Sequence, residues 1–163
     1  QSNLFYGGDM AIKAPPKGKG FYWVQSKLVR ESGPWYATYV KSPEDVVQIL
    51  KEHLDIENAD REHFVAAYLN RKGSLSALEV VSMGGLHSSI VHPREVFKTA
   101  LLCSAASIIL AHNHPSGDST PSREDIEITN RLIEAGKILG IEILDHVIVG
   151  VNQFTSLKAK GLM

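Results

Sequence analysis

The stretch that decides the fold is AHNHPSGDSTPSRED, residues 111–125. It follows the run Ser-Ile-Ile-Leu-Ala at 107–111, whose β-branched and apolar residues are typical of a buried strand. After it, apolar residues at helical spacing predict the longest helix of the chain, from about 122 to 139, with Gly140 placed to end it. A buried strand, a polar loop and a long helix in this order indicate a chain of the α/β class.

Two histidines stand at the end of the predicted strand, and their spacing suits a shared metal ion. His112 and His114 are two residues apart, so a strand projects both imidazoles to the same side. Asp125, in the first turn of the following helix, is a candidate third ligand. Two imidazoles and a carboxylate are typical of catalytic zinc sites, which keep one position open for water. Zinc lowers the pKa of that water toward ~7, so a hydroxide becomes available at neutral pH.

These residues also have simpler structural interpretations. Ser122 and Asp125 match the spacing of a helix capping box, with Asp in place of the usual Glu. Thr120, which a proline follows, is a competing start for the same helix. Asp118 is a rival carboxylate, although the Ser-Gly-Asp run that it ends is more simply a turn. Spacing alone leaves these alternatives open.

The rest of the chain predicts a mixed sheet covered by helices. The predicted helices lie at about 43–53 and 93–103, and the predicted strands at about 62–70, 74–82 and 141–149. Further strand-like or extended runs lie at 21–30, 35–40 and 86–91, and a short strand or turn of helix at 154–161. The short turn at 71–73 makes a hairpin of the strands that flank it. A hairpin among interleaved strands and helices predicts a mixed-sheet α-β-α sandwich around one core.

Length and composition describe one globular domain. The chain has 163 residues, of which 44% are hydrophobic and 21% charged, and this excludes a disordered chain. No apolar run reaches the ~20 residues of a membrane span. The formal net charge of −1 provides no overall basic field for nucleic acid. We interpret residues 1–20 as a tag remnant followed by a flexible basic arm, and expect a single domain over 21–163 with its core at about 40–163.

The cysteine content bears on the cellular compartment. Cys103 is the only cysteine, so no disulfide can form within the chain. That fits a reducing cytoplasm, which is the location that we predict. The apolar residues before Cys103 favour a buried structural role for its thiol.

The loop carries a longer pattern, His-x-His-Pro-(six residues)-Ser-x-x-Asp, which resembles the JAMM signature of zinc isopeptidases. The residues that match it, in one register, are His112, His114, Pro115, Ser122 and Asp125. The segments 91–97, 112–127 and 144–150 are similar to the bacterial RadC family, which carries a JAMM domain. The resemblance covers about residues 40–163 and implies the JAMM/MPN (cytidine-deaminase-like) form of the α-β-α sandwich.

The resemblance also implies roles for individual residues. The two histidines and Asp125 would hold one Zn²⁺ per chain. Glu62 matches the upstream glutamate that JAMM proteins use as the general base, and Glu95, in the family's Pro-Arg-Glu segment, is the rival for that role. The hydroxyl of Ser122 would help to hold the oxyanion of the tetrahedral intermediate.

The activity that the resemblance implies is that of a zinc metallopeptidase or isopeptidase, which cleaves an amide bond in a protein or peptide substrate with a metal-activated water. The alternatives are a DNA-repair-associated or DNA-binding module that retains its zinc, and a metal-dependent nuclease. Full-length RadC proteins carry an N-terminal region that resembles a helix-hairpin-helix module. This chain has no such region in its sequence and resembles the short standalone members, which weakens the transfer of a DNA-repair role. We expect no membrane association.

Three further polar residues receive structural interpretations. Asn113 lies between the two predicted histidine ligands, so its side chain should point away from the metal, and we assign it no role. Asp145 and His146 form a polar pair in an apolar strand. We interpret them as a satisfied structural pair, with a partner for a ligand imidazole as the alternative.

Overall fold

The computed structural model of the protein describes residues 4–6, 10–12, 38–84 and 91–163. The expected arm at 13–20, the strand at 21–30, residues 35–37 of the segment at 35–40 and residues 86–90 of the segment at 86–91 lie outside the described residues. Near the N-terminus, β1 (Leu4–Tyr6) and β2 (Met10–Ile12) pair with each other in antiparallel order.

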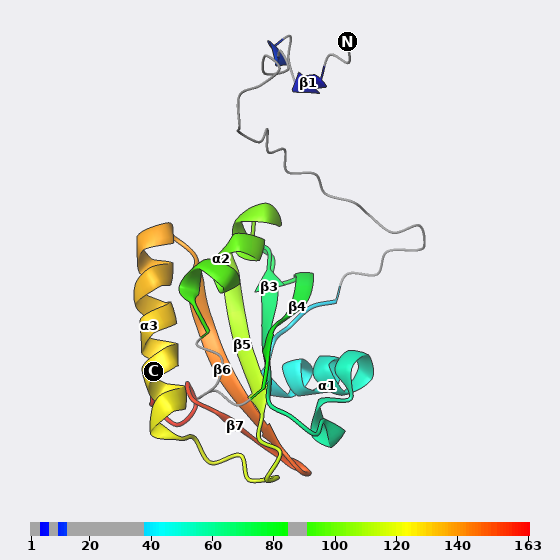
Figure 1. Cartoon of the computed structure of the whole chain (residues 1–163), viewed down its shortest axis with the longest axis vertical. Helices are drawn as coiled ribbons and strands as arrows, with labels where there is room; N and C mark the ends of the chain where they lie inside the picture. Colours follow the sequence, from blue (N-terminus) through cyan, green and yellow to red (C-terminus); the bar gives the residue numbers. More distant parts are fainter. Residues whose placement is uncertain (1–3, 7–9, 13–37, 85–90) are drawn as a thin grey trace, which may run out of the picture.

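The domain is built on a five-stranded sheet (Figure 1). Its strands are β3 (His63–Leu69), β4 (Leu75–Met83), β5 (Ser107–Asn113), β6 (Glu142–Gly150) and β7 (Gln153–Ser156), in the order β4-β3-β5-β6-β7. The central pair β5 and β6 is parallel, whereas the other neighbouring strands of this sheet run antiparallel. The sheet is therefore mixed, and β3 and β4 form the hairpin that the sequence predicted.

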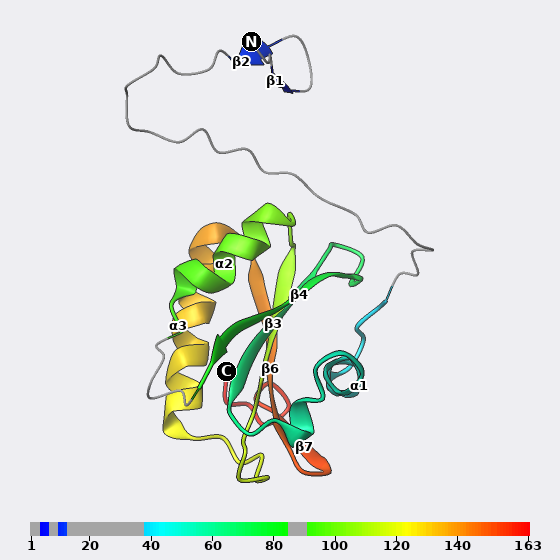
Figure 2. The same cartoon turned by 45° about the vertical axis from the view of Figure 1, so that its right-hand side comes forward.

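Helices cover both faces of this sheet, so the α-β-α sandwich is confirmed (Figures 1 and 2). On one face lie α2 (Pro93–Leu102) and α3 (Arg123–Leu139), and on the other lies α1 (Pro43–Leu54), followed by the 3-10 turn η1 (Ile56–Asn58). Among the described residues, no helix has the length and apolar character needed to span a bilayer.

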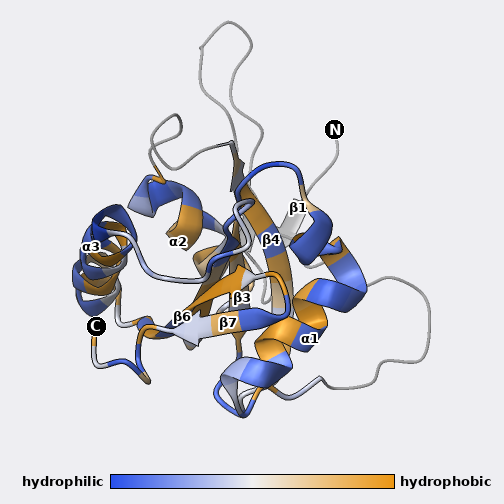
Figure 3. Cartoon of the chain, turned by 90° about the horizontal axis from the view of Figure 1, so that it is seen from below, coloured by the Kyte–Doolittle hydropathy of each residue, from blue (hydrophilic) through white to orange (hydrophobic). Residues whose placement is uncertain are grey.

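Two apolar layers fill the space between the sheet and its helices. Phe64 of β3 packs into the layer under α2 and α3, whereas Val65 packs into the layer under α1. On β5, Leu110 and Ala111 divide in the same way. This is the two-residue period of a strand, and the last two residues of β5 continue it. Figure 3 shows the apolar side of α1 turned toward the sheet.

Local signals set the helix ends as the sequence predicted. At α1, the Ser42 hydroxyl accepts a hydrogen bond from the Asp45 N–H, and the Asp45 carboxylate accepts one from the Ser42 N–H. Gly140 follows α3 with a φ of 69°, a left-handed conformation that glycine adopts without strain, and its N–H donates to the Gly136 carbonyl. The long helix therefore begins and ends where its sequence indicates.

We predict that Gly136 tolerates no side chain, because α3 meets the chain just before β6 at this point. An added Cβ would lie 2.4 Å from the carbonyl oxygen of Ile141 and 3.3 Å from the ring of Phe97. Gly136→Ala should lower the free energy of unfolding by about 1–3 kcal/mol, although alanine favours helices, because the oxygen belongs to the backbone. Urea denaturation measures the change. The exposed neighbour variant Lys137→Ala should stay within about 0.5 kcal/mol of the parent, and an unchanged midpoint for Gly136→Ala would contradict the prediction.

Candidate metal centre

The end of β5 and the start of α3 bring three candidate ligands together. His112 is the last residue but one of β5 and is fully buried. His114 follows β5, and its N–H donates to the Val149 carbonyl at 2.9 Å, so the pairing with β6 continues past the strand. Its side chain therefore keeps to the face of His112, as the spacing predicted. Asp125 is the third residue of α3 and is also fully buried.

These side chains face one another at the distances of ligands around one ion. The Nε2 atoms of His112 and His114 are 3.0 Å apart. Oδ1 of Asp125 lies 3.1 Å from Nε2 of His112, and Oδ2 lies 3.4 Å from Nε2 of His114. Two ligands of a tetrahedral ion with bonds of ~2.0–2.1 Å are about 3.3 Å apart. The group therefore has the composition and the spacing to hold a metal ion.

The protonation of His114 follows from its hydrogen bond to the loop. Its Nδ1 lies 2.7 Å from the carbonyl oxygen of Asp118. A carbonyl can only accept, so Nδ1 carries the proton. In the neutral ring, Nε2 then has a free lone pair, which points at the other two ligands.

The protonation of His112 follows from a chain of buried groups. The Thr129 hydroxyl donates to the carbonyl of Asp125 at 2.6 Å, so it can only accept from Nδ1 of His146. Burial lowers the pKa of His146 and keeps its ring neutral, which leaves a lone pair on Nε2. That atom lies 2.8 Å from Nδ1 of His112, which must donate. His112 therefore also directs the Nε2 lone pair at the metal group.

Three acceptors thus meet with no donor between them. Oδ1 of Asp125 is buried and makes no aligned hydrogen bond within the described part of the chain. Burial alone would raise the pKa of the Asp125 carboxyl, but the hydrogen bond and positive charge of an imidazole protonated on Nε2, together with the Ser122 N–H, hold it well below its usual value. The interaction with Asp125 raises the pKa of His114, so a proton can serve as the cation when no metal is bound. The arrangement fits a divalent ion, which would satisfy all three atoms at once.

The capping box supports the candidate ligand and does not compete with it. Ser122 is the N-cap of α3, and its hydroxyl accepts from the Asp125 N–H at 3.1 Å. Oδ2 of Asp125 accepts from the Ser122 N–H at 2.7 Å, which fixes the carboxylate and leaves Oδ1 facing His112. Thr120 does not start the helix, and Asp118 is an exposed turn residue whose carboxylate accepts from Thr120.

Comparison with known proteins identifies the domain. The family model described as the RadC-like JAB domain matches residues 40–162. The chain belongs to this RadC family. The resemblance that the motif carried is therefore confirmed.

Curated relatives of this RadC-like domain include proteins named UPF0758. A UPF0758 protein of Syntrophomonas wolfei is 65% identical over 126 residues, which cover 76% of this chain and 54% of the relative. A UPF0758 protein of Desulforamulus reducens is 60% identical over 124 residues, with 76% and 54% covered. The chain thus spans about half the length of the curated relatives that it matches.

In this RadC-like domain, Glu62 lies near the candidate ligands. Phe64 pairs with His112 across β3 and β5, and Glu62 precedes Phe64 by two residues, as His114 follows His112 by two. The ring of Phe64 stacks beside that of His112, with centroids 6.2 Å apart, so alternate side chains here face the metal group. The hydrogen bond with Asp125 is the main cause of the raised pKa of His114, and the charge of Glu62 adds to it.

The rival glutamate has a different environment. Glu95 is exposed in the first turn of α2, where its carboxylate lies 3.0 Å from Lys98 and 3.5 Å from Arg94. The hydrogen bond from Lys98 lowers the pKa of this carboxyl. Glu95 thus takes part in a surface ion pair.

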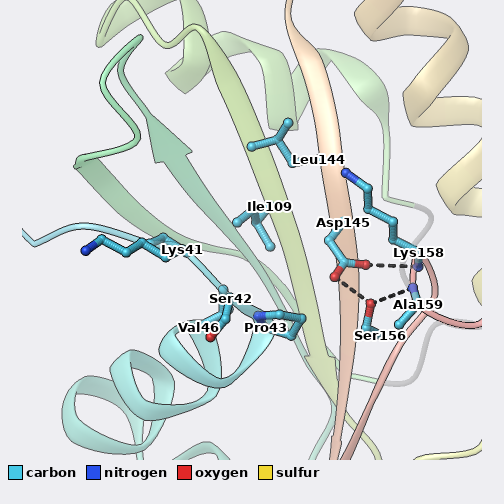
Figure 4. Close-up of a pocket in the computed structure, with 11 residues that line it drawn as sticks. Lys41, Ser42, Pro43, Val46, Ile109, Leu144, Asp145, Ser156, Lys158 and Ala159 are labelled. Atoms are coloured by element: carbon cyan, nitrogen blue, oxygen red, sulfur yellow. Dashed lines mark hydrogen bonds between the residues drawn. The ribbon is translucent and has the colours of Figure 1, made fainter.

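The side chains of Asp145 and His146 lie on opposite faces of β6 and do not contact each other, although the Asp145 carboxylate accepts from the His146 backbone N–H at 2.7 Å, which corrects the interpretation of the two as one structural pair. His146 faces α3 and is the partner of the His112 imidazole. Asp145 points to the opposite face, where its carboxylate accepts from the Ser156 hydroxyl at 2.6 Å and the Lys158 N–H at 3.1 Å (Figure 4). Period-two alternation in β6 requires this division, because neighbours in a strand cannot share a face.

A glycine contact holds the loop that carries Asp118. The Gly117 carbonyl accepts from the Val151 N–H at 3.0 Å and from the Gln153 side chain at 2.7 Å. A Cβ on Gly150 would lie 2.4 Å from that same oxygen. The bare backbone of Gly150 therefore lets the loop approach β6 and place the Asp118 carbonyl against His114.

We predict that the Thr129 hydroxyl sets the affinity for metal. Thr129→Val removes the acceptor of the His146 Nδ1 proton, so His146 can shift its proton to Nε2 and force one onto the metal-facing nitrogen of His112. Metal affinity should fall about 10–100-fold, the usual effect of losing such an outer partner. Competition with a chelator measures it. Thr99→Val, which removes a threonine hydroxyl from α2, should leave the affinity unchanged, and equal affinities for both variants would contradict the assigned chain.

Proposed function

We propose that this domain is a zinc-dependent hydrolase of the JAMM type, a metallopeptidase or isopeptidase that cleaves an amide bond with an activated water. One observation carries the proposal: two imidazole lone pairs and a buried carboxylate converge within 3.0–3.4 Å. Zinc commonly takes this nitrogen and oxygen set, and three protein ligands are the mark of a catalytic site because one position stays open. When bound, zinc supplies a Lewis acid that polarises the carbonyl and acidifies water.

Two side chains of this domain would complete the reaction. Glu62, whose charge acts on His114, would accept a proton from the attacking water and pass it to the leaving amine. Ser122 uses its oxygen to accept from the Asp125 N–H, so its own proton is available to donate to the oxyanion. The same contact that caps α3 therefore orients the hydroxyl.

The substrate class follows from the proposed chemistry. We propose a protein or peptide with an amide or isopeptide bond as the substrate, and a cytoplasmic location in keeping with the single cysteine. The net charge of −1 gives the DNA-binding and nuclease alternatives no overall basic field to support them.

Metal content tests the ligand assignment. The purified protein should contain close to one zinc per chain, because three convergent donors hold one ion. His112→Ala combined with His114→Ala should remove it, since a single carboxylate cannot retain zinc. Elemental analysis of dialysed protein measures the ratio. His63→Ala combined with His92→Ala is the control that removes two histidines outside the group, and zinc retained by the ligand double variant would rule the site out.

Activity tests the general base. Glu62→Gln should keep the zinc and lower kcat by about 10²–10⁴-fold, because the amide cannot accept the proton. An internally quenched peptide library provides the assay. Glu95→Gln, the matched change at the rival glutamate, should retain the parent activity. Loss of activity in Glu95→Gln alone would reverse the assignment.

A further inference from the structure

The residue between the two histidines holds the backbone on both sides of Glu62. Asn113 is the last residue of β5 and is 2% exposed. Its Oδ1 accepts from the His63 N–H at 2.8 Å, and its Nδ2 donates to the Arg61 carbonyl at 2.9 Å. The alternation of side chains along a strand predicted that Asn113 points away from the candidate ligands. It could not predict the bonds to His63 and Arg61, which lie 50 and 52 residues away along the chain.

These two hydrogen bonds fix the backbone conformation of a single residue. The Arg61 carbonyl belongs to the peptide group that precedes the Cα of Glu62, and the His63 N–H belongs to the peptide group that follows it. Holding both planes restrains φ and ψ of Glu62, the two soft torsions that aim its side chain. The Glu62 carbonyl also accepts from the Gly84 N–H at 2.9 Å, so the peptide group between Glu62 and His63 is also hydrogen-bonded to the residue after β4.

The chemistry of the contact suits a side-chain amide. One end must accept from an N–H and the other must donate to a carbonyl, and the amide of Asn offers both in one planar group. Aspartate would offer acceptors alone and would repel the Arg61 carbonyl. The clamp acts where the strand pairing changes, because Glu62 precedes the first residue of β3 and the paired register between β3 and β5 begins at Phe64 and His112.

We propose that Asn113 is a positioning residue that locks the general base to the strand that carries the metal ligands, an inference that rests on the proposed function of Glu62. The positions of His112 and His114 determine where a metal ion and its water would lie. Asn113, between them, fixes the position and direction of the Glu62 side chain relative to that point. A misplacement of ~1 Å at a catalytic group can cost about 10²-fold in rate.

The test uses Asn113→Ala in the full zinc-loaded chain. Zinc content should stay at the parent level, kcat on the quenched peptide library should fall about 10–100-fold, and KM should change less than twofold. Hydrogen exchange at the His63 amide should become faster, since its acceptor is lost.

Asn70→Ala is the matched control. The Asn70 side chain accepts from the Lys72 and Ser74 N–H groups in the turn between β3 and β4, so this variant also loses two bonds to the backbone. It should lower the unfolding midpoint to a similar degree but leave kcat and KM unchanged. If Asn113→Ala fails to fold, Asn113→Asp should show the loss of kcat. This variant has nearly the same volume and retains an oxygen that accepts from the His63 N–H, but it cannot donate to the Arg61 carbonyl.

The possible outcomes separate the two levels of inference. Unchanged kcat in both Asn113 variants, with Glu62→Gln inactive, would overturn the positioning role alone. Full activity in Glu62→Gln, or no hydrolysis by the parent chain, would overturn the proposed function and this inference with it. Equal losses of kcat in the Asn113 and Asn70 variants would show a general effect of stability and overturn the positioning role.

Discussion

The functional end of this domain depends on one electrostatic constraint, the crowding of three acceptors at the point where His112, His114 and Asp125 meet. Buried acceptors at 3.0–3.4 Å with no donor between them repel one another unless a cation is present. Metal binding and the stability of this part of the fold are therefore linked. An ion that binds the folded chain and not the unfolded one stabilises it by mass action.

A chain of hydrogen bonds behind this point joins three elements. It runs from His112 on β5 to His146 on β6 and to Thr129 on α3, and it ends at the backbone carbonyl of Asp125. Each link limits the proton positions of the next, so the metal-facing nitrogen of His112 is set before any ion arrives, and the Asp118 carbonyl sets that of His114. Asn113, the next residue of β5, contacts the backbone beside Glu62, and the alternation of one strand thus connects the candidate ligands with the proposed base.

Much of this could be predicted because its signals are local. The His-x-His spacing, the Ser122 cap, Gly140 and the hairpin turn each act within a few residues, and the structure confirms each of these elements. His146 and Asn113 could not be assigned in the same way, because their partners lie 34 and 50 residues away. Their roles depend on strand order and register, which the parallel pairing of β5 with β6 and the antiparallel pairing with β3 determine. Asp145 shows the opposite kind of error. Its carboxylate is buried and adjacent in sequence to His146, but its hydrogen bonds are made on the face of β6 away from the candidate ligands.

The position of Asp125 explains how one carboxylate can serve as helix cap and candidate ligand. A buried carboxylate tends to become neutral, but at the third position of α3 it lies at the positive end of the helix dipole and accepts from the Ser122 N–H. The cap engages Oδ2, and its geometry turns Oδ1 toward His112. The pattern His-x-His-Pro-(six residues)-Ser-x-x-Asp therefore specifies a strand end, a loop length and a helix start together with the ligands. Each part taken alone has an ordinary structural explanation, and the fixed register between the parts is what makes the pattern specific.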